Sequence, residues 1–298
     1  FGVSWFGLSG VGLKNCEILN VDTGVSIQDS TGADVQNVGI DSTAPAEGLR
    51  LFGTSTAALR QMRVRNVHDA FNIQPGSSAA LSALEISDVN YGVVLVQGGN
   101  SAISNVAVRN AGVIALLVAD SPNISVEGFS VLGRPTAGTG DGVTFISGTS
   151  GTIRNAITSG GNSGLHVQYD ALGATITDST SSCTNRGAAL DGPGPFLVFH
   201  NNFFGSALAQ VARLGPYGPT QLWDTRSGSL TYQQGNHWGR QCPGPLFVQS
   251  ADVGRFDVTD DFPFASMSGW AAGEVPGCPT AAVPAPPRSR APRFPSSR

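Results

Sequence analysis

The chain has 298 residues, of which 40% are hydrophobic and 13% charged, and it contains 39 glycines. Globular domains usually carry about 25% charged residues and about 7% glycine, so this composition leaves few solvated helix faces and many turns. The aliphatic residues are mostly Val, Ile, Leu and Ala, which favours an all-β fold. Because the chain has no apolar run of about 18 residues, no membrane-spanning segment is predicted.

The formal net charge is −4 at pH 7. Four arginines and no acidic residues lie in the segment 279–298, so the rest of the chain is more acidic than this total. Phosphate binding requires a basic stripe, and the charge therefore argues against nucleic acid as a partner. An acidic surface is compatible with neutral glycans, or with acidic glycans bridged by Ca²⁺.

One unit recurs along the chain: a small residue, an apolar-x-apolar alternation, a loop, and a second short alternation. It starts at Gly24, Gly48, Ala70, Gly92, Gly142, Gly164 and Gly187, and a further start is placed at Val113. The period of two within each unit indicates strands, since a helix cannot satisfy it. Units of about 22 residues built only from strands predict an all-β, single-stranded right-handed parallel β-helix of about ten coils.

Polar or small residues stand four positions before several starts, at Asn20, Asn66, Asp88, Gly160 and Cys183. Stacked turns would place them about 4.8 Å apart, where amide side chains can satisfy the backbone groups of the turns. We interpret them as structural and not as site residues.

These repeats resemble the pectin-lyase-like superfamily of right-handed parallel β-helices, and the likeness covers residues 1–235. The segments GNHWG (235–239) and DDFPF (260–264) resemble the ending of NosD-like β-helix proteins. The only methionines are Met62 and Met267. We therefore carry over no copper role and predict neither a cofactor nor a metal site.

The C-terminal part is expected to form two further segments. Residues 236–278 should be an irregular cap, whose aromatic side chains cover the last coil. Residues 279–298 are rich in Pro and Arg and should be disordered. We expect a disulfide between Cys242 and Cys278, whereas Cys16 and Cys183 should be buried thiols. A disulfide implies an oxidising compartment, so we expect an extracellular or cell-surface protein, with the periplasm as the alternative.

The other end of the solenoid should differ from the capped one. Because Phe1 begins directly in strand-like sequence, we expect the first coil to expose apolar surface.

The outward positions of the strands after each start form two rows. Their polar members predict a saccharide-binding strip beside Phe52, and the residues expected to bind substrate are Arg50, Asn72, Gln74, Gln168 and Tyr169.

A catalytic group is the alternative interpretation of the same face. Neighbouring coils should bring together His166, Asp170 and Asp191, in which a histidine beside carboxylates could act as a general base. Weak support for Ca²⁺ comes from Asp252, Asp257, Asp260 and Asp261, although their spacing matches no EF-hand and favours turn and capping roles.

The sequence thus predicts a monomeric secreted or surface β-helix that binds a polysaccharide or similar polymer on an outward sheet face. One alternative is a carbohydrate-active lyase, hydrolase or epimerase that uses the His166 region. The other is a structural solenoid within a larger adhesin-like protein.

Overall fold

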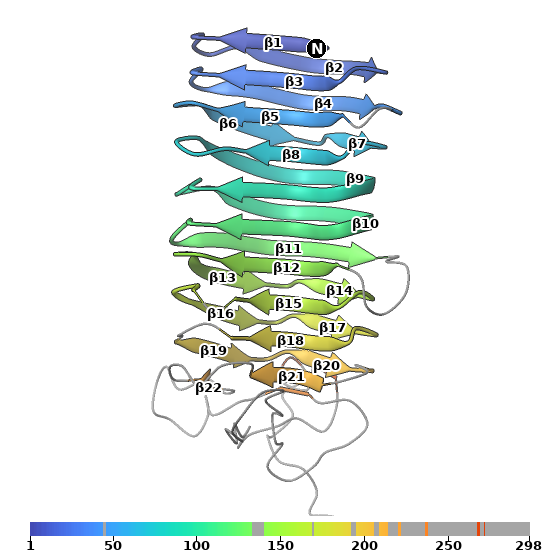
Figure 1. Ribbon diagram of the computed structural model, residues 1–298, viewed down its shortest axis with the longest axis vertical. Coiled ribbons are helices and arrows are strands. Elements are labelled where there is room, and N and C mark those ends of the chain that lie inside the picture. The colour runs from blue at the N-terminus through green and yellow to red at the C-terminus, as the bar shows by residue number, and fades with distance from the viewer. Residues whose placement is uncertain are drawn as a thin grey trace, which may run out of the picture.

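The computed structural model describes residues 1–43, 46–132, 140–168, 170–191, 195–205, 209–213, 220–221, 236–237, 267–268 and 271. Figure 1 shows the strands stacked from β1 at one end to β21 and β22 near the other. All strand pairings among these residues are parallel, each joining one coil to the next. The predicted parallel β-helix is confirmed, with slightly fewer turns than the ten expected.

Three parallel ladders run along the solenoid. The first, called sheet 1 below, contains β1 (Val3–Phe6), β3 (Thr23–Gln28), β5 (Glu47–Phe52), β8 (Asp69–Ile73), the last parts of β9 (Ser78–Val96) and β10 (Ala102–Ala119), β12 (Asp141–Ile146), β15 (Ser163–Val167), β18 (Arg186–Leu190) and β21 (Ala209–Arg213).

The second ladder contains the first parts of β2 (Gly12–Leu19), β4 (Ala33–Asp41), β9, β10 and β11 (Ile124–Leu132), with β6 (Thr56–Arg60), β13 (Ser150–Arg154), β16 (Gly173–Thr177), β19 (Phe196–Phe199) and β22 (Thr220–Gln221). The third ladder is formed by the later parts of β2, β4 and β11, the middle parts of β9 and β10, and β7 (Arg63–Arg65), β14 (Ile157–Ser159), β17 (Thr180–Ser182) and β20 (Asn202–Phe204).

The core consists of side chains that stack in register inside the solenoid. In sheet 1 one inward column contains Val25, Leu49, Phe71, Val93, Leu116, Val143 and Leu165, all fully buried. Side chains of the opposite face alternate with this column, and the register places level with one another the residues two positions after each predicted start, Ser26, Arg50, Asn72, Val94, Thr144, His166 and Ala189, of which Ser26, Thr144 and Ala189 are buried. The period-two alternation in the sequence therefore predicted correctly which face of sheet 1 each side chain belongs to.

One predicted coil start is wrong. The residue of β10 level with Gly92 is Ala115, because Tyr91 pairs with Ile114 and Val93 with Leu116. The register shifts between Ala111 and Ile114, so one extra residue is accommodated there. Val113 lies at this irregularity with its side chain exposed.

The residues interpreted as structural have a left-handed backbone conformation. Asn20, Asn66, Asp88 and Cys183 have φ between 54° and 56°, in the left-handed region that Asn and Asp adopt most readily among non-glycine residues. The expectation of two buried thiols is wrong, because the Cys183 side chain belongs to an exposed turn residue and Cys16 is only partly buried. A tight outward turn presents its side chain to solvent whatever its polarity.

The two ends of the solenoid are described to different extents. At the N-terminal end the first coil exposes Phe1, Phe6, Leu8 and Leu19, as expected. At the other end Cys242 and Cys278, the four aspartates considered for Ca²⁺, most of the cap and the whole tail lie outside the described residues. In the part of the chain described, no helix is long and apolar enough to cross a bilayer.

Candidate functional site

A histidine held between two carboxylates occupies the outward face of sheet 1. His166 is the central outward residue of β15, between Thr144 and Ala189 of the neighbouring coils. Its Nδ1 lies 2.8 Å from Oδ2 of Asp141, the first residue of β12. The other oxygen of Asp141 accepts hydrogen bonds from the backbone N–H of Ser163 (3.0 Å) and from the Asn162 amide (3.2 Å). Asp141 is therefore fixed on both sides and orients the imidazole.

The second carboxylate comes from the coil on the other side. Nε2 of His166 lies 3.6 Å from Oδ2 of Asp191, which directly follows β18. The side chains of His166, Asp141 and Asp191 are 14%, 13% and 22% exposed. The sequence prediction that His166 and Asp191 lie close together is thus met by the geometry, and we call these three residues the Asp-His-Asp cluster.

The electrostatics of the Asp-His-Asp cluster favour the charged imidazolium. Burial by itself lowers the pKa of His166, but the hydrogen bond to Asp141 and the negative charges of Asp141 and Asp191 outweigh it and raise this pKa to about 9. Burial acts in the opposite direction on Asp141, where the hydrogen bond and charge of His166 dominate and hold the pKa below its ordinary value. At neutral pH the cluster is therefore a cation bridging two anions on adjacent coils.

Asp170, the third residue expected in the catalytic group, is not part of this arrangement. The carboxylate of Asp170 accepts hydrogen bonds from the backbone N–H of Ser147 at 2.8 Å and from its hydroxyl at 2.9 Å. These bonds, led by the backbone N–H, lower the pKa of Asp170 and assign it to a turn. Tyr169 lies outside the described residues.

The expected binding strip is partly assembled, near the other end of the same sheet. The Arg50 guanidinium lies over the Phe52 ring, 4.9 Å from its centroid. In the amide orientation that satisfies both side chains, Oε1 of Gln74 accepts hydrogen bonds from Nε and Nη2 of Arg50, each at 3.1 Å. Arg50 is thereby held flat against the outward surface, with 40% of its side chain still exposed.

A second pair of side chains extends this strip toward the neighbouring edge of the sheet. Asn72 donates a hydrogen bond to Glu47 at 3.1 Å, and Glu47 lies 3.9 Å from Arg50. Gln168 follows β15 and belongs to the same outward row as Gln74, but β9, β10 and β12 separate the two. The structure therefore brings together Arg50, Asn72 and Gln74, and not Gln168.

Sequence reasoning missed Asp141 as a partner of His166. The stacking of coils predicts which residues of neighbouring coils lie level with one another, and the residue level with Asp141 is Ser163, not His166. The contact is diagonal and depends on the reach of two side chains. The available signal was the D-G pair at the start of this coil, which places a carboxylate three residues before the outward position.

Comparison with known proteins identifies the family. The sequence model of a family described as periplasmic copper-binding protein (NosD) matches residues 31–241, more than half of the chain. The chain belongs to the NosD family. Its description as periplasmic agrees with the expected location outside the cytoplasm. No curated protein and no solved structure matches the chain.

The copper in the NosD description requires a test against the side chains present. Copper sites use neutral imidazole, thiolate or thioether ligands that converge on one point. Met62 is buried in the core, and His166 is held as an imidazolium. The described ranges contain no group of three or more His, Cys, Asp or Glu residues that could hold a metal ion. The described residues therefore do not fit a copper ion, and we derive no step through one.

Proposed function

We propose that this NosD-family β-helix binds a polysaccharide chain on the outward face of sheet 1, at the strip formed by Arg50, Phe52, Asn72 and Gln74. The observation that carries the proposal is the stacked and hydrogen-bonded Arg50, which stays partly exposed while its position is fixed. A fixed donor loses less side-chain entropy on binding than a free one. An aromatic side chain beside such donors is what a saccharide surface requires.

The shape of the surface supports a polymer over a small molecule. The strip lies on a sheet that continues through successive coils, with strands about 4.8 Å apart. Each coil offers a further outward residue to a chain that runs along the solenoid axis. Gln168, four strands beyond Gln74 in the ladder and so roughly 19 Å away, would be reached only by a long chain.

The Asp-His-Asp cluster gives less support to the enzymatic alternative. The 2.8 Å distance between His166 and Asp141 is short enough for proton transfer, whereas the 3.6 Å distance between His166 and Asp191 exceeds hydrogen-bond reach. A general base must, however, be unprotonated at the working pH, and the pKa of His166 is about 9. Two flanking carboxylates make this histidine a stable cation, which favours a structural role across three coils.

We expect binding to be distributed over the strip. Arg50→Ala, Asn72→Ala and Gln74→Ala should each weaken binding of a recognised glycan by roughly 2- to 12-fold, since an exposed hydrogen bond contributes about 0.5–1.5 kcal/mol. Gln168→Ala should affect only long chains. A glycan array would identify the ligand, and calorimetric titration with short and long forms would measure these changes.

The matched control is Ser125→Ala, which removes an exposed side chain from a different ladder. This variant should bind like the unmodified protein. Full affinity in the Arg50→Ala and Gln74→Ala variants, or no binding to any arrayed glycan, would contradict the proposed strip.

A further inference from the structure

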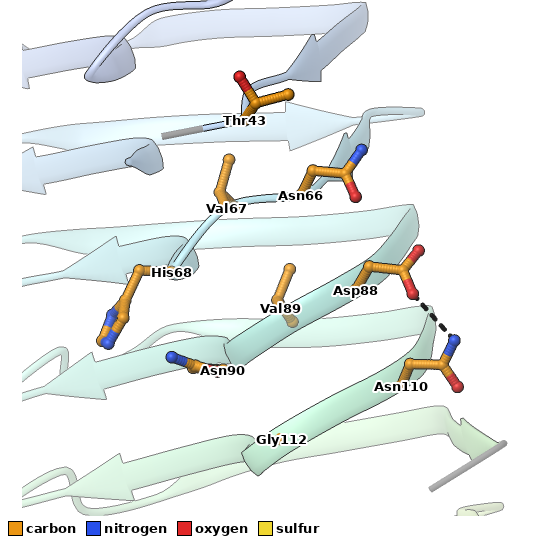
Figure 2. A pocket seen from close by; sticks show the side chains of 9 residues that line it. All are labelled: Thr43, Asn66, Val67, His68, Asp88, Val89, Asn90, Asn110 and Gly112. Carbon is orange, nitrogen blue, oxygen red and sulfur yellow. Dashed lines mark hydrogen bonds between the residues drawn. The ribbon is translucent and has the colours of Figure 1, made fainter. Parts of the chain in front are cut away.

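A trough separate from the strip crosses the bends where the chain enters sheet 1. It has a volume of about 610 Å³ and is lined by equivalent residues of three coils, 66–68, 88–90, and Asn110 with Gly112, with Thr43 at one end. Volumes of about 300–1,000 Å³ are usual for ligand sites. Figure 2 shows Asn66, Asp88 and Asn110 along one side, His68 and Asn90 along the other, and Val67 and Val89 between them.

The first wall is built by the turn geometry of the repeat. Asn66, Asp88 and Asn110 have φ of 56°, 56° and 55°, so their side chains leave successive coils in the same direction. The Asn110 amide donates to Asp88 at 2.9 Å, and the Asn66 amide donates to Asp41 at 2.7 Å. These bonds order the wall and leave the amide oxygens of Asn66 and Asn110 on its exposed side.

The floor and the second wall have different chemistry. Val67 and Val89 are buried and present only a small apolar surface, while Gly112 has no side chain to fill the third position. His68 and Asn90 are exposed, and Nδ1 of His68 lies 2.7 Å from Asp69, which orients the ring. The Asn90 amide makes no hydrogen bond to any described side chain, so it is available to a ligand.

We propose that this trough binds a segment of an extended, neutral β-linked glycan that lies parallel to the solenoid axis. The first wall offers a hydrogen-bonding side chain in each of three successive coils, at about 4.8 Å, close to the advance of an extended β-1,4 chain per sugar, and the second wall offers one in two of these coils, at His68 and Asn90. The small apolar surface of Val67 and Val89 adds a limited contact for C–H groups of the rings. The lining contains Asp88 and no Arg or Lys, so the carboxylates of an acidic glycan would meet a like charge.

This proposal takes its class of ligand, a polysaccharide, from the proposed function, but it places the ligand at a different site. The probe is cellotetraose, titrated into the full chain by calorimetry, with tetragalacturonate as the acidic comparison. Gly112→Leu should abolish cellotetraose binding by filling the trough. His68→Ala and Asn90→Ala should each weaken it by roughly 2- to 12-fold, one exposed hydrogen bond apiece. Tetragalacturonate should bind more weakly than cellotetraose.

The substitutions lie at positions where they should leave the fold intact, so that a change in binding reports on the trough itself. Truncation at Asn66, Asp88 or Asn110 would strain a left-handed turn, whereas a Cβ at Gly112 would have as its nearest neighbour the flexible Asn90 amide oxygen, at 3.1 Å, with backbone atoms at ordinary contact distances of 3.8 and 3.9 Å. Gly99→Leu is the matched control, because a side chain there would enter open space away from the trough. It should bind cellotetraose normally, and circular dichroism should show all four variants folded.

The outcomes separate the two sites. Cellotetraose binding that is lost in Gly112→Leu but kept in Arg50→Ala supports the trough. Binding lost in Arg50→Ala but kept in Gly112→Leu overturns the trough and leaves the proposed function intact. Absence of cellotetraose binding also overturns the trough, while a glycan recognised only through Arg50 would still support the strip.

Discussion

Phe71→Ala should lower the free energy of unfolding by about 3–5 kcal/mol, the usual cost of removing a large aromatic side chain from a packed core. Phe71 is fully buried and stacks between Leu49 and Val93 of the adjacent coils. Because a solenoid coil contacts only its neighbours, the cavity would weaken both interfaces of this coil at once. Urea unfolding followed by circular dichroism would measure the loss.

Two variants control for this result. Phe71→Leu keeps most of the volume and should cost less than about 1.5 kcal/mol. Asn72→Ala changes the next residue of the same strand, which points outward and donates one hydrogen bond to Glu47, and should cost no more than about 1.5 kcal/mol. Equal losses in Phe71→Ala and Asn72→Ala would show that the inward and outward faces of β8 are assigned wrongly.

The repeat made the faces of sheet 1 predictable because alternation and stacking are both local rules. Once Gly48 and Ala70 are recognised as equivalent, Arg50 and Asn72 must lie level with one another, as they do. The same rule failed at Val113, since a one-residue insertion before Ile114 leaves the apolar alternation readable in more than one register. Only the pairing with β9 and β12 selects Ala115.

The two sites were predictable to different extents for a related reason. The approach of His166 to Asp191 follows from neighbouring coils, but the contact with Asp141 is diagonal and the repeat does not encode it. The trough was missed because its first wall consists of turn residues with an evident structural role. Its width depends on Gly112, at the irregular bend that the repeat also failed to predict.

The stability of the solenoid should fall as the pH rises from about 6 to above 9, and His166 should account for roughly 3 kcal/mol of this change. Its pKa is about 9 in the folded chain and 6.5 ordinarily, so the folded state binds the proton more tightly. The stabilisation is therefore complete below about pH 6.5 and disappears as the pH rises through about 9. Because His166 is 14% exposed, solvent screens the bridge only slightly.

The measurement compares the unmodified protein with His166→Gln by urea unfolding at intervals between pH 6 and pH 10. The difference between the two free energies of unfolding isolates His166 from other groups that titrate in this range, and it should be largest at pH 6. Hydrogen exchange should place the loss in β12, β15 and β18, the strands that the Asp-His-Asp cluster joins. His68→Ala is the control, since His68 is exposed and its ring interacts with Asp69 and Tyr91 at a different part of the solenoid. If His166→Gln and the unmodified protein lost stability in parallel with pH, the imidazolium bridge would not hold these coils together, and His166 would again be a candidate for a free catalytic base.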